Sequence, residues 1–182
     1  MKTFLKFQQL AKVVPFLVYQ EFNNEISLVV SKNTLLFVLT FLKLHIGLQY
    51  KLLSCISGVD FLTKSYSFSV VYDLLSITYN SRLRIKVFIN EISSLPSIVK
   101  VFINANWWER EIWDLYGIYF DQHPDLRRIL TDYGFEGHPM RKDFPLSGYI
   151  EVRYDDNKKR IVVEPIELTQ ELRYFTFESP WL

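Results

Sequence analysis

The sequence predicts an α+β fold, in which helices pack on one face of a mainly antiparallel sheet and a long extended arm follows. Three observations support this prediction. Two stretches in the middle of the chain alternate between apolar and polar residues, as strands with one wet face do. Other segments repeat apolar residues at helical spacing. After residue 130 no long helical period continues, and glycines and prolines punctuate the chain. We therefore predict a domain over residues 1–130 and an arm over residues 131–182.

The first half of the predicted domain contains two helices and a strand. Apolar residues recur at helical intervals over residues 4–14, so we predict a short helix that ends at Pro15. Residues 26–30 form a short apolar run with β-branched side chains, which favours a strand. The nearly continuous apolar residues of 32–45 predict a helix that lies across a sheet, with Ser31 as its cap.

Three further strands complete the predicted sheet. Residues 50–59 form one, and the alternating residues 68–74 and 83–89 form an antiparallel pair around a polar turn at residues 80–81. The order along the domain is thus helix, strand, helix, three strands and helix. The last strand bears a basic row, which either faces solvent or meets an acidic partner: Arg82, Arg84 and Lys86.

The last predicted helix spans residues 107–117 and is rich in aromatic residues. Its apolar side chains fall on two stripes, so we expect it to be buried on more than one side. Asn104 or Asn106 is a suitable N-cap, and Gly117 stands where a left-handed residue would end the helix. Arg110 and Asp114 lie four residues apart and are spaced to form a pair on one face.

The acidic residues of this helix, together with His123, raise the question of whether they form a catalytic or metal-binding site. A general acid/base site or half of a metal site needs convergent ionisable groups. However, Glu109 and Glu111 are two residues apart and point in different directions on a helix. We therefore expect a buried charged network that fixes the helix and docks on a partner. A free-standing hydrolase or metal enzyme using Glu109, Glu111, Asp114 and His123 is the alternative, and stoichiometric zinc or iron with activity would support it.

The arm is expected to lie along another protein. Residues 148–154 and 160–164 are predicted to form a hairpin, and the rest of the arm is predicted to be extended. The arm has too many aromatic residues for a disordered linker. The side chains that we expect to contact a partner are Arg128, Arg141, Lys142, Phe144 and Trp181, together with Arg127.

Composition excludes several classes of function. The 182 residues have a net charge of +1, so there is no basic field for nucleic acid. Cys55 stands alone, which excludes an internal disulfide and an iron–sulfur cluster held by this chain. No glycine motif for nucleotide or flavin binding is present. The most apolar run, residues 35–42, is too short for a bilayer span.

Many aromatic residues and only two alanines suggest an A+T-rich organelle genome, and the N-terminus shows no convincing import peptide.

The central stretch resembles the signature of the 30-kilodalton subunit of respiratory complex I, which is called subunit 9 where mitochondria encode it. The resemblance continues in the arm over residues 134–139, 141–146, 148–149, 151–154 and 179–181. The positions that match the signature, at matching spacing, are Glu109, Arg110, Glu111, Asp114, Leu115, Tyr116, His123, Arg127, Ile129 and Leu130.

This resemblance implies a subunit of the proton-translocating NADH:ubiquinone oxidoreductase. The subunit would lie in the peripheral arm, on the matrix side of the mitochondrial inner membrane, and would pack against the 49-kilodalton subunit and its neighbours. It would support assembly and stability of the quinone-reducing module without catalytic residues of its own. FMN, iron–sulfur clusters and ubiquinone would belong to other subunits. The related subunit of membrane-bound nickel–iron hydrogenases is the nearest alternative.

Overall fold

The computed structural model describes residues 14–22, 25–61, 66–171, 173–177, 179 and 181. The predicted helix over residues 4–14 lies outside these residues, apart from Val14. The chain divides into two compact units, one ending at Glu136 and one beginning at Gly137. The sequence placed this boundary six residues earlier.

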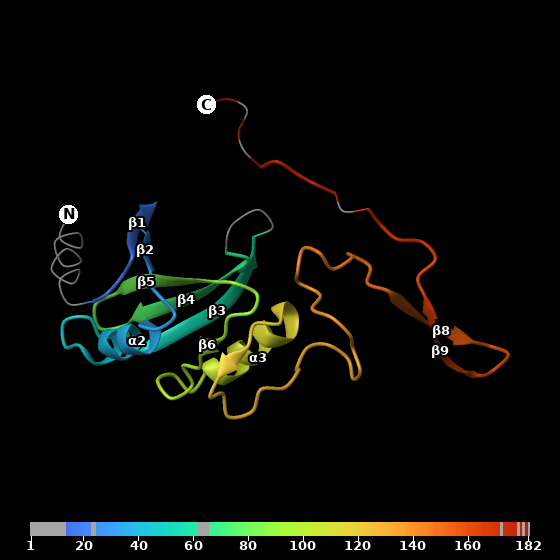
Figure 1. The fold of residues 1–182 in the computed structure, drawn as a ribbon, viewed down its shortest axis with the longest axis horizontal. Coiled ribbons are helices and arrows are strands. Elements are labelled where there is room, and N and C mark those ends of the chain that lie inside the picture. Colours follow the sequence, from blue (N-terminus) through green and yellow to red (C-terminus); the bar gives the residue numbers. More distant parts are fainter. Residues whose placement is uncertain are drawn as a thin grey trace. The chain divides into compact units, whose positions relative to one another are not determined.

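A five-stranded sheet organises the first unit (Figure 1). Its strand order is β1-β2-β5-β4-β3. The β2–β5 pair is parallel and the other three pairs are antiparallel, which agrees with the prediction of a mainly antiparallel sheet. The strands are β1 (Val18–Phe22), β2 (Glu25–Val29), β3 (Leu52–Asp60), β4 (Phe68–Ser76) and β5 (Ser81–Ile89).

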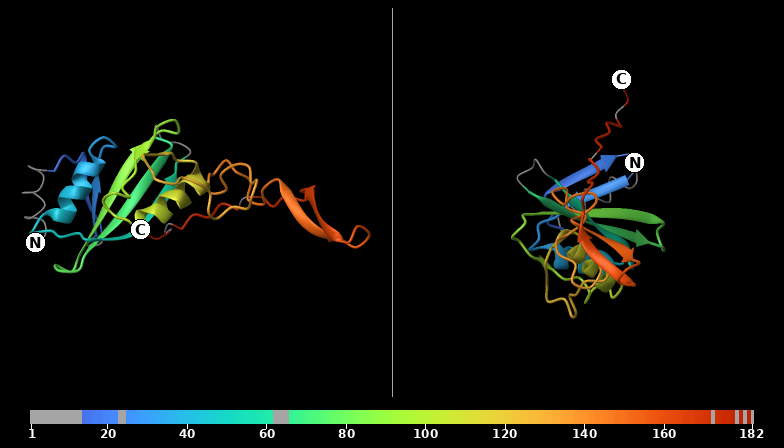
Figure 2. Two further views of the ribbon diagram at one scale, coloured as in Figure 1. Left: turned by 90° about the horizontal axis from the view of Figure 1, so that it is seen from below. Right: turned by 90° about the vertical axis from the view of Figure 1, so that its right-hand side faces the viewer.

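Two helices, α2 (Leu35–Leu44) and α3 (Ala105–Tyr116), pack on one face of this sheet, as predicted (Figure 2). Every second residue of β4 and β5 points to this face and is buried. These side chains form one cluster with the buried sides of α2 and α3. The opposite face of the sheet bears the basic row of β5, where Arg84 pairs with Asp73 at 2.8 Å and with Glu25 at 3.1 Å.

The structure corrects three details of the predicted elements. Helix α2 begins at Leu35, not at residue 32, because residues 31–34 form a turn in which the Thr34 N–H donates to the Ser31 carbonyl at 3.2 Å. Ser31 is therefore not the N-cap. The sequence also missed β1 at the sheet edge, because most of its side chains are exposed and leave little alternation to detect. A short parallel pair, β6 (Leu95–Pro96) with β7 (Phe120–Asp121), was missed as well.

The second unit contains the predicted hairpin, formed by β8 (Ile150–Asp155) and β9 (Arg160–Pro165). Arg153 forms two hydrogen bonds of 2.7 Å with the carboxylate of Glu164 across the strands. The Asp155 carboxylate accepts backbone N–H groups of the turn, which fixes its shape. Within the described part of the chain, no helix has both the length and the apolar character needed to cross a membrane.

Candidate functional site

The candidate site consists of helix α3 and residues 118–131, which we call the return segment. The return segment begins at the β6–β7 pair and then runs back along α3. The Gly117 backbone adopts the left-handed conformation, with φ of 78°, and its N–H donates to the Trp113 carbonyl. This confirms the predicted end of the helix. Asn104 occupies the N-cap position, but its side-chain amide donates to the Leu53 carbonyl on β3 at 2.8 Å.

Glu109 lies inside the protein and is fully buried. Its carboxylate accepts a hydrogen bond from the Ser97 hydroxyl at 2.6 Å and one from the Ile98 N–H at 2.7 Å. Burial raises the pKa of Glu109 to about 7, although both hydrogen bonds oppose this rise. Glu109 therefore ties α3 to the chain just after β6.

His123 is the partner of Glu109 from the return segment. Its Nε2 lies 3.7 Å from the Glu109 carboxylate and 3.2 Å from the Asn106 carbonyl. Its Nδ1 accepts the Asp125 N–H at 3.1 Å. Burial lowers the pKa of His123, so the neutral ring is favoured at neutral pH.

Asp114 is fully buried and holds the end of the return segment. One carboxylate oxygen accepts the N–H groups of Ile129, Leu130 and Thr131 at 3.2, 2.8 and 2.9 Å. The other accepts the Thr131 hydroxyl at 2.7 Å and the Arg128 guanidinium at 3.0 Å. Burial opposes ionisation of Asp114, but these donors outweigh it and its pKa is lowered. Asp114 thus acts like a cap for three backbone N–H groups.

The structure replaces the expected Arg110–Asp114 pair with two separate interactions. Arg110 donates to the carbonyls of Arg127 and Arg128, while Asp114 pairs with Arg128. Each guanidinium also lies over an indole ring. Arg110 is 5.4 Å from the Trp107 ring centre, and Arg128 is 5.8 Å from that of Trp113.

Helix α3 is buried on more than one side, as predicted, but charged side chains and not only apolar ones provide this burial. Trp107 is 67% exposed, and the other three rings of the helix are only partly buried. The side chains that are buried include Glu109, Ile112 and Asp114. The reason is that the side of α3 away from the sheet faces the return segment, whose backbone needs hydrogen-bond partners more than apolar surface.

The remaining signature residues lie at the edge of this network. Glu111, Leu115, Tyr116 and Ile129 are partly buried, while Leu130 is exposed. Arg127 is exposed and pairs with the exposed Asp125 at 2.9 Å. The Tyr116 ring lies so close to Gly58 of β3 that a Cβ there would be 2.7 Å from it.

Sequence reasoning missed three residues of this network: Gly58, Ser97 and Thr131. It named Asn106 only as a possible N-cap, whereas the structure places the Asn106 carbonyl 3.2 Å from His123 Nε2. Ser97 and Gly58 lie far from the signature in sequence, and no pattern connects them to it. Thr131 directly follows the signature, so its position was the one available signal. Among the described residues, no group of three or more His, Cys, Asp or Glu side chains is arranged to hold a metal ion.

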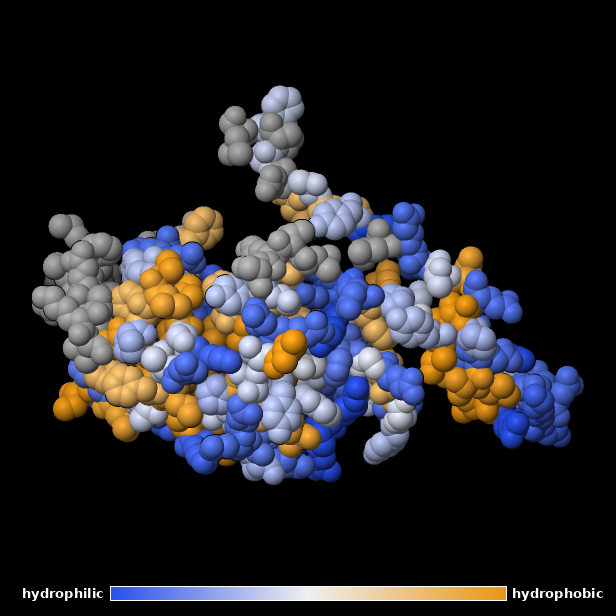
Figure 3. Space-filling model, viewed as in Figure 1, coloured by the Kyte–Doolittle hydropathy of each residue, from blue (hydrophilic) through white to orange (hydrophobic). Residues whose placement is uncertain are grey.

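The hairpin of the second unit has one apolar face, formed by three cross-strand pairs (Figure 3). We call these residues the hairpin face: Ile150, Val152, Tyr154, Ile161, Val163 and Pro165. All six side chains are exposed. The opposite face has the Arg153–Glu164 pair. An exposed apolar face of this kind is a typical protein-binding surface.

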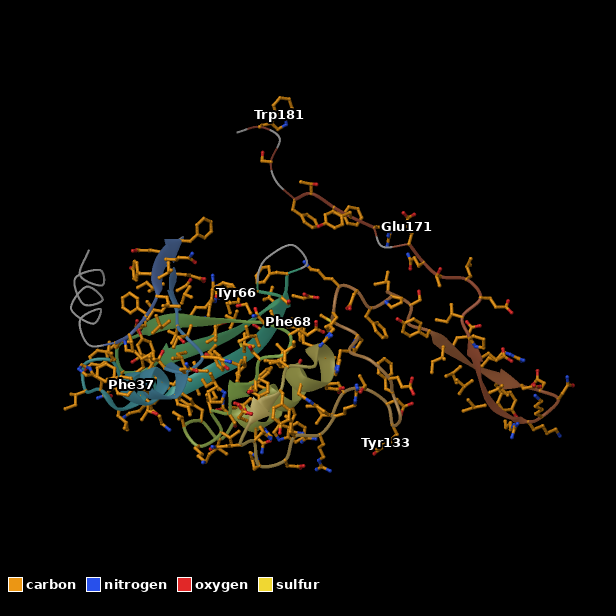
Figure 4. The ribbon with its side chains drawn as sticks, in the orientation of Figure 1. Phe37, Tyr66, Phe68, Tyr133, Glu171 and Trp181 are labelled. Atoms are coloured by element: carbon orange, nitrogen blue, oxygen red, sulfur yellow. The ribbon has the colours of Figure 1, made fainter. Side chains whose placement is uncertain are left out.

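The predicted contact residues of the second unit differ in exposure. The Phe144 ring packs edge-on against Tyr149, with ring centres 5.4 Å apart. Arg141 is partly buried and Lys142 is exposed. Trp181 is 89% exposed, near the end of the extended C-terminal stretch (Figure 4).

Three comparisons place this fold and site among known proteins. Residues 28–150 match the sequence model of the family described as respiratory-chain NADH dehydrogenase, 30 Kd subunit. The chain is 57% identical over 158 residues to NADH-ubiquinone oxidoreductase subunit 9 of Reclinomonas americana, covering 87% of this chain and 78% of that one. It is 59% identical over 144 residues to NADH dehydrogenase [ubiquinone] iron-sulfur protein 3 of Solanum tuberosum, covering 79% and 76%.

A solved structure shares the fold. It is that of the membrane-bound sulfane sulfur reductase, an archaeal respiratory membrane complex, and one of its chains matches with a TM-score of 0.68. The match covers 79% of this chain and 86% of the archaeal one, at 21% identity. At that identity the likeness supports the fold and nothing further.

Proposed function

Since this chain belongs to the family of the 30-kilodalton subunit of respiratory-chain NADH dehydrogenase, we propose that it is a structural subunit of the enzyme's peripheral arm. Its function is to support electron transfer from NADH to ubiquinone by holding the quinone-reducing module together. Its main partner is the 49-kilodalton subunit, and it works on the matrix side of the mitochondrial inner membrane. The relatives of 57–60% identity favour this enzyme over a nickel–iron hydrogenase.

The observation that supports this role most directly concerns the second unit, in which no apolar side chain is buried among the described residues. All six side chains of the hairpin face are exposed. A two-stranded hairpin alone is marginally stable in water. Because burial of apolar surface is the main source of stability, a partner that covers this face would supply what the hairpin lacks. We assign the hairpin face to the contact with the 49-kilodalton subunit.

The first unit adds a second contact surface next to its buried network. The buried carboxylates of Glu109 and Asp114 are satisfied inside the chain. Trp107, Arg127 and Leu130 lie in the same region and are exposed. Trp and Arg are enriched where protein interfaces bind most strongly. These three side chains are the docking residues we assign to the first unit.

We assign no cofactor to this chain. The potato relative is called an iron-sulfur protein, but the sequence has one cysteine, Cys55, whereas a cluster needs about four ligands of this type. FMN, iron–sulfur clusters and ubiquinone then bind to other subunits. The scarcity of alanine supports an organelle-encoded chain, and the coding DNA would test this point.

The central experiment compares two neighbouring valines on opposite faces of β9. Val163→Asp places a charge on the hairpin face, and Val162→Asp places it on the other face. Burying an unpaired charge costs several kcal/mol. Val163→Asp should therefore reduce incorporation into a particle many times larger than the 21.7 kDa chain by at least about tenfold. Incorporation is measured on native gels stained for NADH oxidation.

The result for Val162→Asp decides how this experiment is interpreted. We expect near-normal incorporation of that variant, and unchanged circular dichroism of both isolated variants. Equal incorporation of the two variants would contradict the assignment of the hairpin face. In the isolated wild-type chain, residues 150–165 should be cleaved by protease before the first unit is, because the buried apolar side chains of the described residues all lie in the first unit. Equal resistance of both units would also count against the proposal.

A further inference from the structure

The buried histidine of the return segment is restricted to one neutral form. Its Nδ1 accepts the Asp125 N–H at 3.1 Å, so this nitrogen has no hydrogen. Its Nε2 therefore has the hydrogen and donates it to the Asn106 carbonyl at 3.2 Å. The ring of His123 thus joins a turn of the return segment to the first turn of α3.

The charges around this ring come from two elements. Helix α3 contributes Glu109, whose carboxylate lies 3.7 Å from Nε2, and Arg110, which opposes a positive charge on the ring. The return segment contributes Asp125, which favours that charge. Tyr72 of β4 is fully buried, and this burial, followed by the negative charge of Glu109, raises the pKa of its phenol. The side chains of His123 and Glu109 are both buried, so water screens the interaction between these two groups little.

We propose that His123 is a proton-sensitive latch on the turn at residues 123–125 of the return segment. One proton taken up from solvent binds to Nδ1, where it faces the Asp125 N–H, so that two donors oppose each other. The Asp125 hydrogen bond is then lost, because Nδ1 has no remaining lone pair to accept it. The charged ring also remains in a site that excludes water, beside the Arg110 guanidinium. The turn at residues 123–125 opens, while Asp114 still holds residues 129–131.

The latch is a property of the chain by itself and does not depend on which partner binds. The return segment that it holds also bears Arg127, so opening the turn changes a surface next to α3. The direction of the pH response follows from the hydrogen bond that Nδ1 accepts from the Asp125 N–H. The latch is closed when the ring is neutral and opens as the pH falls.

The test follows the ring nitrogens of His123 and the exchange of the Asp125 amide in the full-length chain. Above neutrality, nitrogen NMR should show the hydrogen on Nε2. Between about pH 7.5 and about pH 5.5, the Asp125 amide should exchange at least about tenfold faster after correction for its intrinsic rate. The change should have the same midpoint as the ring signals. A hydrogen on Nδ1 above neutrality, or equal protection of Asp125 at both pH values, would overturn the proposal.

Three variants identify the group that takes up the proton. His123→Asn keeps an oxygen to accept the Asp125 N–H but cannot be protonated, so exchange at Asp125 should become independent of pH. His138→Asn is the matched control, because His138 also precedes a proline, and it should behave as the wild type does. Glu109→Gln should keep the pH response. If Glu109→Gln abolished the response while His123→Asn preserved it, the proton would act at Glu109 and the latch would be wrong. If His123→Asn did not fold, the wild-type spectra alone would decide.

Discussion

The buried carboxylate of Asp114 should account for much of the stability of the return segment. Asp114→Asn keeps the shape of the side chain but replaces one acceptor oxygen with an NH₂ donor. If the oxygen that accepts three backbone N–H groups is retained, the amide then faces the Arg128 guanidinium and the Thr131 hydroxyl. The Arg128 guanidinium, which is partly buried, then loses its ion pair with the Asp114 carboxylate. Removing one partner of a buried pair costs about 3–5 kcal/mol, so we expect a loss of this size in the free energy of unfolding.

Urea unfolding of the full-length chain, followed by tryptophan fluorescence, measures this loss. The matched control is Asp125→Asn, which removes the other Asp–Arg pair of the return segment. The carboxylate of Asp125 is 57% exposed and its partner Arg127 is 70% exposed, so the control should lose less than about 1 kcal/mol. Amide exchange should show lost protection over residues 129–131 in Asp114→Asn alone.

The pH dependence supplies a second check on Asp114. Its pKa is lowered in the folded protein from an ordinary value of 3.8. The stability that ionised Asp114 contributes is therefore fully present above 3.8 and is lost as the pH falls through the folded pKa. The difference between wild type and Asp114→Asn should shrink in this acidic range. A loss below about 1 kcal/mol at neutral pH, or a difference that persists in strong acid, would refute the reasoning.

Two further predictions follow from the same site. The pKa of Glu109 is raised from 4.5 to about 7, so its ionisation opposes folding increasingly as the pH rises through this window. Relative to wild type, Glu109→Gln should therefore gain about 2.5 kcal/mol of stability from pH 5 to pH 8, and a constant difference in urea titrations would contradict this. Gly58→Ala should cost about 1–3 kcal/mol because the new Cβ meets the Tyr116 ring, and the loss should shrink when Tyr116→Leu makes room; equal losses in both backgrounds would exclude that contact.

The sequence was sufficient to predict the sheet strands with strong alternation, both described helices and the hairpin. These elements have local patterns, as in β5, where Leu83, Ile85 and Val87 alternate with basic residues. It was not sufficient to predict β1, whose side chains are mostly exposed. The hydrogen-bond partners of the buried charges could not be predicted from the sequence either. Ser97 and Glu109 meet only because β6 pairs with β7 and brings distant segments together.

The buried charges of α3 satisfy the backbone of the return segment that lies along it. A segment without secondary structure, such as residues 123–131, has backbone N–H groups that need acceptors. An apolar helix face would leave those groups unsatisfied, at about 1–3 kcal/mol each. Asp114 satisfies three of them at once. Trp107 lies on the exposed part of the same helix, where its ring can contact a partner.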